Sequence, residues 1–216
     1  MSFAGLIEIF LHLDVHLNEW IGLLGPWIYL LLFLIIFCET GLVITPFLPG
    51  DSLLFALGAL AATDQAVLRL PLLMILLMAA AVLGDAVNYS IGRRIGPKVF
   101  REGARWWLSK KHLLATEAFY ERHGGKTIVI ARFMPIIRTF APFVAGVGTM
   151  TYRRFAVFNV AGALLWVFAF LLGGYYFGNI PAVKRNFEFV ILGIVALSCM
   201  PLFLRLVKGL RKAKRL

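Results

Sequence analysis

The chain has 216 residues, of which 61% are hydrophobic and 15% charged, and its formal net charge is +11. A soluble domain of this length could not bury so much apolar surface, so the composition indicates a single membrane domain. The charge distribution argues against nucleic-acid binding, because the basic residues flank apolar segments and form no separate basic domain.

Residues 1–25 contain three acidic residues and no Lys or Arg, unlike the basic start of a cleaved signal peptide. Apolar and polar residues alternate there at helical spacing, which predicts an amphipathic helix at the membrane interface. His12 and His16 stand one helical turn apart, but no third ligand accompanies them. Cys38 and Cys199 are far apart within apolar stretches. We therefore expect no metal and no cofactor.

The next segment, residues 26–63, is apolar but too long for one helix, and Pro46, Pro49 and Gly50 interrupt it. Non-helical backbone at membrane depth is tolerated only where protein or a water-filled cavity surrounds it. We therefore predict a re-entrant hairpin, which is two half-helices joined by a proline-rich turn. An alternative is that residues 27–44 form a full span, about 27 Å long at helical rise.

A second broken stretch, residues 126–148, contains Pro135 and Pro142 and is predicted to form a second hairpin. Complete spans are expected where an apolar stretch reaches about 30 Å at helical rise. Three stretches meet this requirement: residues 70–91, 155–178 and 187–207.

Lys and Arg are concentrated in residues 93–125, which we interpret as a loop with an amphipathic helix, and in the tail, residues 208–216. The positive-inside rule places both on the cytoplasmic side. Arg153 and Arg154 follow the second hairpin, so that hairpin is expected to begin and end in the cytoplasm. The N-terminus is then outside, or inside if residues 27–44 span the membrane.

The two halves of the chain resemble each other. "FALGALAAT" at residues 55–63 matches "FVAGVGTMT" at residues 143–151 in its small residues. Similarly, "NYSIGRRIGP" at residues 88–97 resembles "GYYFGNIP" at residues 174–181. On the topology above the copies have opposite orientations, as in secondary transporters. The predicted fold is an all-α integral membrane protein, an inverted repeat with two re-entrant hairpins plus transmembrane and interfacial amphipathic helices.

Four charged residues lie in the broken segments: Glu39 and Asp51 in the first, Arg132 and Arg138 in the second. A charge at the bilayer centre costs about 2.5–3.5 kcal/mol on insertion scales, so these groups must be paired or hydrated. One interpretation is a salt-bridge network that only fixes hairpin docking. We favour a functional site, because apolar packing would serve docking equally well.

The residue types suggest an anionic substrate. Arginine offers a permanently charged fork of donors suited to phosphate, and a carboxylate in a low-dielectric site can take up a proton near neutral pH. We hypothesise that Glu39 or Asp51 takes up a proton while Arg132 and Arg138 hold phosphate. Asp85 is expected near the cytoplasmic end of its span, hydrated or paired with the basic loop, and is given a supporting role.

The segments "FCETGLVITPFLPGDSLLFALGALA", "GDAVNYSIGR", "FYERHGGKTIVIARFMPIIRTFAPFVAG" and "YRRFAVFNVAGALLWV" closely resemble the bacterial DedA family. This resemblance implies an inner-membrane protein with two re-entrant hairpins, related to eukaryotic scramblases of the VTT-domain group. It also implies a part in recycling undecaprenyl phosphate across the membrane. The family's essential acidic pair matches Glu39 and Asp51, and its essential arginines match Arg132 and Arg138.

Three other functions remain open. A lipid phosphatase would need a nucleophile and an acid, but no His lies in the predicted membrane segments, so we expect no enzymatic activity. A proton-coupled exporter of small cations fits the carboxylates, but two buried arginines oppose it. A scramblase or flippase of phosphatidylethanolamine is a further alternative, and a passive scramblase would equilibrate lipid without any gradient.

Overall fold

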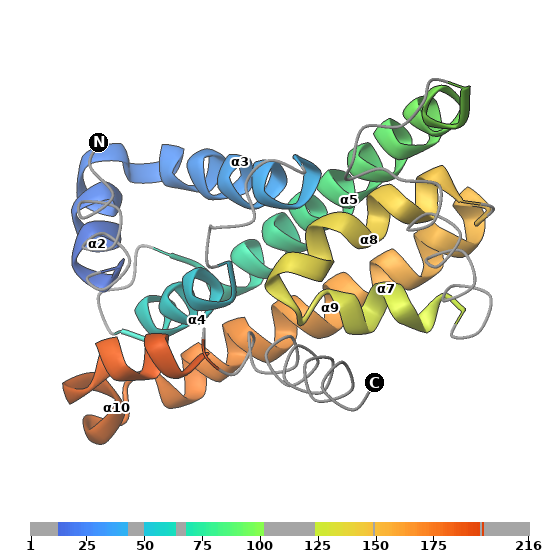
Figure 1. The fold of residues 1–216 in the computed structure, drawn as a ribbon. Coiled ribbons are helices and arrows are strands. Elements are labelled where there is room, and N and C mark those ends of the chain that lie inside the picture. The colour runs from blue at the N-terminus through green and yellow to red at the C-terminus, as the bar shows by residue number, and fades with distance from the viewer. Residues whose placement is uncertain are drawn as a thin grey trace, which may run out of the picture. The chain divides into compact units, whose positions relative to one another are not determined.

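The computed structural model describes residues 13–42, 50–63, 68–101, 124–148, 150–194 and 196, and every regular element in these ranges is a helix (Figure 1). The all-α prediction is therefore confirmed for the described chain. The helices are α2 (Leu13–Leu24), η1 (Gly25–Trp27), α3 (Ile28–Gly41), α4 (Gly50–Ala61), α5 (Leu70–Arg101), α7 (Lys126–Ala131), α8 (Pro135–Val147), α9 (Tyr152–Phe177) and α10 (Pro181–Arg185).

Several predicted features lie outside the described residues. These are the first part of the N-terminal amphipathic helix with His12, the turn with Pro46 and Pro49, most of the basic loop, the end of the third predicted span with Cys199, and the tail.

Three helical stretches are long and apolar enough to cross a membrane: Glu19–Gly41, Leu70–Ile95 and Tyr152–Phe177. The last two contain or nearly match predicted spans, which supports a membrane protein. The helix predicted over residues 70–91 continues to Arg101, because Arg93 and Arg94 are good helix formers that end the apolar pattern without ending the helix. Residues 187–194 of the third predicted span are helical.

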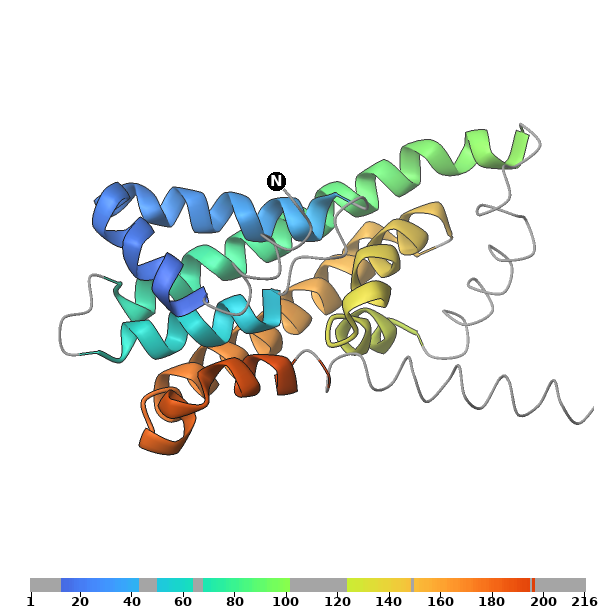
Figure 2. The same ribbon diagram turned by 60° about the vertical axis from the view of Figure 1, so that its left-hand side comes forward.

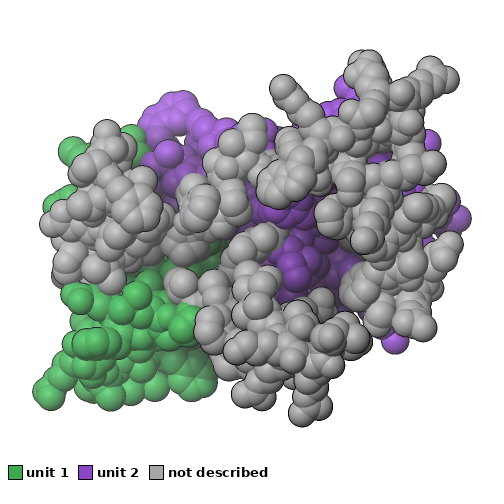
Figure 3. Space-filling model, viewed as in Figure 1, with its two compact units in different colours: residues 1–26, 49–70, 169–216 green, residues 27–48, 71–168 purple. Residues whose placement is uncertain are grey.

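The chain folds into two compact units (Figure 3). Unit 1 comprises residues 1–26, 49–70 and 169–216, and unit 2 comprises residues 27–48 and 71–168. Both are assembled from distant parts of the sequence, so each depends on long-range packing.

In unit 1, α4 packs closely against the C-terminal part of α9. A Cβ atom at Gly58 would overlap the carbonyl oxygen of Leu171, and one at Gly174 would overlap that of Phe55. Glycine allows the two backbones to approach this closely, as is common between membrane helices. The Asn179 side-chain amide donates to the carbonyl of Ala59 at 2.9 Å and ties the end of α4 to the residues that follow α9.

In unit 2, α8 packs against α5 in a similar way. A Cβ at Gly146 would overlap the carbonyl oxygen of Tyr89, and one at Gly92 would overlap that of Phe143. A further close approach joins α3 to α5, where a Cβ at Gly84 would overlap the Thr40 hydroxyl. These contacts leave little space between the helices, so the side chains beside them have fixed positions.

The two helix pairs use related sequence positions. Gly58 and Gly146 are 88 residues apart, as are Phe55 and Phe143, which is the offset of the first repeat match. In unit 1, α4 from the first predicted repeat packs on α9 from the second repeat. In unit 2, α8 from the second repeat packs on α5 from the first. The other two glycines of these contacts, Gly92 and Gly174, are not equivalent positions in the second repeat match. Their spacing differs from the offset of that match by one helical turn.

The second predicted hairpin consists of two short helices, α7 and α8, joined by a sharp turn (Figure 2). Pro135 is the first residue of α8, where its missing N–H group costs nothing. Pro142 lies inside α8 without ending it. With 6 and 13 residues, neither helix reaches the ~20 residues that a span requires. Two half-helices are thus present, and their re-entrant course stays a prediction.

Candidate functional site

Arg132 lies directly after α7 and is almost completely buried, with 3% of its surface exposed. One nitrogen, Nη2, donates to Asp85 of α5 and also to Asn159 Oδ1 of α9, at 2.6 Å from the latter. Asn159 is oriented by its own amide nitrogen, which donates to the carbonyl of Val82 at 3.0 Å. The turn between α7 and α8 is therefore anchored to α5 and α9 by one guanidinium group.

Asp85 does not occupy the hydrated position expected from the sequence. It is 5% exposed and pairs with Arg132. The reason is the length of α5, which continues for sixteen residues beyond Asp85 and leaves it well inside the helix. The structure thus brings Asp85 into direct contact with one of the predicted arginines.

Arg138 of α8 pairs with Glu39 of α3, with 3.5 Å between Nη1 and Oε1. The two residues are 7% and 3% exposed. The guanidinium carbon of Arg138 lies 4.3 Å from the centre of the Trp166 ring, and that of Arg132 lies 5.9 Å from it. Trp166 is fully buried, so both cations lie near the same aromatic ring in a water-poor environment.

Asn88 connects the helices that carry this pair. Its amide nitrogen donates to the carbonyl of Thr40 at 3.1 Å and to that of Thr139 at 2.7 Å. Thr40 follows Glu39 and Thr139 follows Arg138, so one buried amide on α5 sets the spacing of α3 and α8 where the ion pair forms.

We call these residues of unit 2 the buried charge cluster: Glu39, Asp85, Asn88, Arg132, Arg138, Asn159 and Trp166. Its two carboxylates and two guanidinium groups carry no net formal charge. Nε and Nη1 of Arg132 have no hydrogen-bond partner among the described residues. Buried donors are normally paired, so these nitrogens mark a position suited to an anion.

Asp51 belongs to the other unit. It is the second residue of α4, directly after Gly50, and is 5% exposed. Of the four charged residues predicted as the site, three therefore belong to the buried charge cluster of unit 2 and Asp51 belongs to unit 1.

The VTT domain family matches residues 48–176, more than half of the chain. Protein DedA of Escherichia coli K12 is 52% identical over 210 residues, 97% of this chain and 96% of that protein. The chain belongs to the DedA family. This DedA-family chain is also 40% identical to an uncharacterized membrane protein of Mycobacterium leprae, over 84% of this chain and 80% of that protein. Inner membrane protein YghB of Salmonella typhimurium is 37% identical, over 74% and 72% of the two chains. No solved structure matches.

Three residues of this DedA-family site were not singled out as site residues from the sequence. Asn88 and Asn159 are amides within apolar helices, and polar side chains in such helices often mark functional or helix-joining positions. That signal could have been used for both. Trp166 had no such signal, because one more aromatic residue in an apolar helix is indistinguishable from ordinary packing.

Proposed function

We propose that this protein moves a lipid with an anionic phosphate group across the bacterial inner membrane and that protons drive the movement. The observation that carries the proposal is the buried charge cluster, a charge-balanced set of groups in which two nitrogens of Arg132 remain available as donors. Arginine donors match phosphate oxygens and keep their charge when buried.

Charge balance suggests how protons couple to the substrate. A phosphate group that enters the cluster brings at least one negative charge, and an unbalanced charge in a water-poor site is costly. Uptake of one proton by a carboxylate restores neutrality. We assign this proton to Asp85, because loss of its negative charge also makes one N–H of Arg132 Nη2 available for phosphate, while the other N–H stays bonded to Asn159. Glu39 and Asp51 remain the other candidates.

In this proposal the two hairpins are re-entrant, the halves form an inverted repeat, and the protein crosses the membrane several times with residues 93–125 and the tail in the cytoplasm. The reciprocal glycine contacts of α4 and α8 support the repeat. The substrate proposed from the family resemblance is undecaprenyl phosphate. Transport is favoured over catalysis, because the buried charge cluster contains no Ser, Cys or His, and its two carboxylates, Asp85 and Glu39, are each paired with an arginine.

A reconstituted transport assay tests the proposal. The purified protein in liposomes is expected to move undecaprenyl phosphate between leaflets, faster with a pH gradient than without one. Arg132→Lys keeps the positive charge beside Asp85 but removes the remaining donors, so the rate should fall at least tenfold, whereas exposed Lys126→Gln should keep it. Each carboxylate variant is reconstituted from monodisperse purified protein, so that only folded protein is compared. Asp85→Asn should remove the dependence of the transport rate on the pH gradient, and Glu39→Gln should retain it.

Other results would support different functions. Equal movement of phosphatidylethanolamine without a gradient would identify a passive scramblase, and release of inorganic phosphate would identify an enzyme. Gradient-driven efflux of a small cation, with no lipid movement, would identify an exporter. Normal lipid movement by Arg132→Lys would exclude the buried charge cluster as the phosphate site.

A further inference from the structure

A second polar site lies in unit 2, where α5 meets the start of α9. A cavity of about 230 Å³ is bordered by residues from α5, α8, the α8–α9 connection and α9: Tyr89, Arg93, Gly146, Gly148, Met150, Thr151 and Tyr152. None of these seven residues is acidic, and Arg93 supplies a positive charge. None of them belongs to the buried charge cluster.

The walls of this cavity are held in place by close packing. The glycine contacts of Gly92 with Phe143 and of Gly146 with Tyr89 fix α8 against α5. The Tyr89 hydroxyl donates to the carbonyl of Met150 at 2.5 Å, and its ring stacks on Phe155 with 4.5 Å between centroids. Tyr89 therefore ties the start of α9 to α5.

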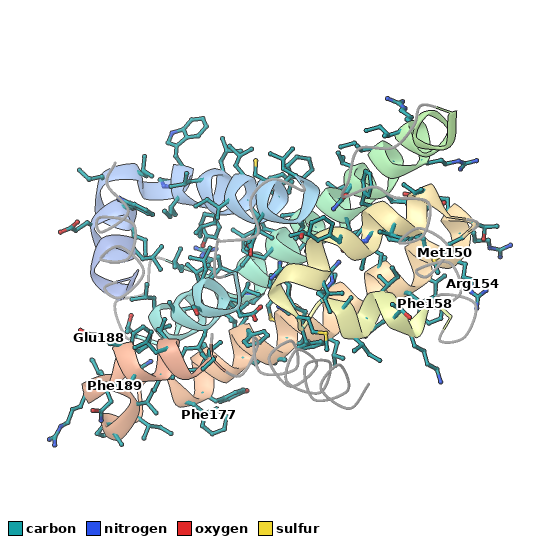
Figure 4. The ribbon with its side chains drawn as sticks, in the orientation of Figure 1. Met150, Arg154, Phe158, Phe177, Glu188 and Phe189 are labelled. Atoms are coloured by element: carbon teal, nitrogen blue, oxygen red, sulfur yellow. The ribbon has the colours of Figure 1, made fainter. Side chains whose placement is uncertain are left out.

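Further positively charged residues adjoin the lining residues in the sequence. Arg94 follows Arg93 on α5, and Arg153 and Arg154 are in the first turn of α9, where no acidic residue occurs. Figure 4 shows Met150 and Arg154 together at the end of the ribbon where α9 begins. The first N–H groups of α9 point toward this end and add partial positive charge. An anion is thus the expected ligand.

The position along the helices suggests where this anion comes from. Arg93 lies near the end of the candidate span Leu70–Ile95, and Tyr152 begins the candidate span Tyr152–Phe177. The cavity therefore lies at the level where a span leaves the hydrocarbon, which is where lipid headgroups and interfacial tyrosines lie. Arg93 and Tyr152 are both exposed, so a ligand can reach the cavity.

The size of the cavity limits the ligand further. Sites for drug-sized molecules occupy about 300–1,000 Å³, so this smaller space suits a phosphate group and not a whole lipid. We propose that Arg93 and the start of α9 bind the phosphate group of a membrane lipid at the interface. This site is distinct from the buried charge cluster, and the proposal does not require transport.

Lipid binding to the purified full-length protein tests this inference. Native mass spectrometry in neutral detergent would count bound dioleoyl phosphatidate, with uncharged dioleoylglycerol as the lipid control. Loss of a charge-assisted contact should make Arg93→Gln bind phosphatidate about tenfold more weakly, and Arg93→Lys should recover part of the binding. The matched control is Arg94→Gln, an exposed neighbour that does not line the cavity.

Two further arms identify the source of the phosphate and separate the two sites. Competition by inorganic phosphate would show that the phosphate group alone is recognised, and lack of competition would show that the lipid is required. Arg132→Gln should leave this interfacial binding intact even if it abolishes transport. Equal losses of phosphatidate binding with Arg93→Gln and Arg94→Gln would overturn the inference. Binding that depends on Arg132 and not on Arg93 would overturn it too. The thermal midpoint of each variant shows whether it is folded.

Discussion

At the residue scale, Arg132 shows how one side chain acquires both a structural and a chemical role. Its Nη2 serves two acceptors on different helices, while the other two nitrogens of its guanidinium group have no partner in the described part of the chain. Asp85 supplies the compensating charge and Asn159 only a neutral acceptor. The two partners of Arg132 should therefore respond differently to substitution.

Asp85→Asn is expected to lower the thermal midpoint markedly, because it leaves Arg132 as an uncompensated buried charge. Breaking a buried pair on one side typically costs about 3–5 kcal/mol. Asp85→Asn combined with Arg132→Gln should be less destabilised than Asp85→Asn alone, since no net charge is left in the cluster. Thermal unfolding of the detergent-purified variants measures this, with exposed Lys184→Gln as the control. A double variant as unstable as the sum of both single variants would show that the charges do not interact.

At the element scale, the short helices depend on glycine. Helix α4 lies against α9, and α8 against α5, with backbone in contact with backbone. Without these close approaches the helix backbones would lie further apart, and Asn88 could not reach the carbonyl of Thr139 on α8. The small residues of the repeat are thus part of what positions the charged side chains.

Gly146→Ala is expected to destabilise the protein, because the added methyl group would overlap the Tyr89 carbonyl and neither backbone can move aside cheaply. Overpacking of this kind costs about 1–3 kcal/mol. Gly22→Ala is the matched control: among the described residues, no atom outside its own helical turn lies within 4 Å of its added Cβ, and alanine should stabilise helix α2 slightly. The two thermal midpoints should move in opposite directions, and a neutral Gly146→Ala would argue against close packing of α8 on α5.

At the scale of the whole molecule, the side on which the two ends of the α7–α8 pair lie distinguishes a re-entrant hairpin from a single span. Re-entrant hairpins place their two ends on one side, whereas a single span places them on opposite sides. The positively charged flanks at Lys126 and Arg153 favour the same side.

In a variant lacking Cys38 and Cys199, single cysteines replacing Lys126 and Thr151 should both be protected from a membrane-impermeant maleimide in intact spheroplasts. Both should react after permeabilisation. Because the predicted span 155–178 starts in the cytoplasm and leads outward, a cysteine replacing Asn186 should react without permeabilisation and serves as the control. All three positions are exposed. Labelling of Lys126→Cys and Thr151→Cys from opposite sides would show that residues 126–148 span the membrane and do not form a re-entrant hairpin.

The sequence by itself determined the solvent and the class of the protein. An apolar composition leaves lipid as the only suitable environment, and charged residues inside apolar segments are costly enough to identify Glu39, Asp51, Arg132 and Arg138 as candidates. Pro135 marked the break between α7 and α8, whereas Pro142 did not mark a helix end. These inferences use local properties, which a residue carries wherever the chain folds.

Only the tertiary structure decided which charges meet. Arg132 pairs with Asp85, and Asp51 lies in a different compact unit from Glu39. Contacts with the charged residues or their neighbours also come from three residues of apolar helices: Asn88, Asn159 and Trp166. A contact between residues 47 positions apart depends on helix length, rotation and close approach, and a misjudged helix end was sufficient to misplace Asp85. Periodicity describes each helix alone, whereas pairing is a property of several helices packed together.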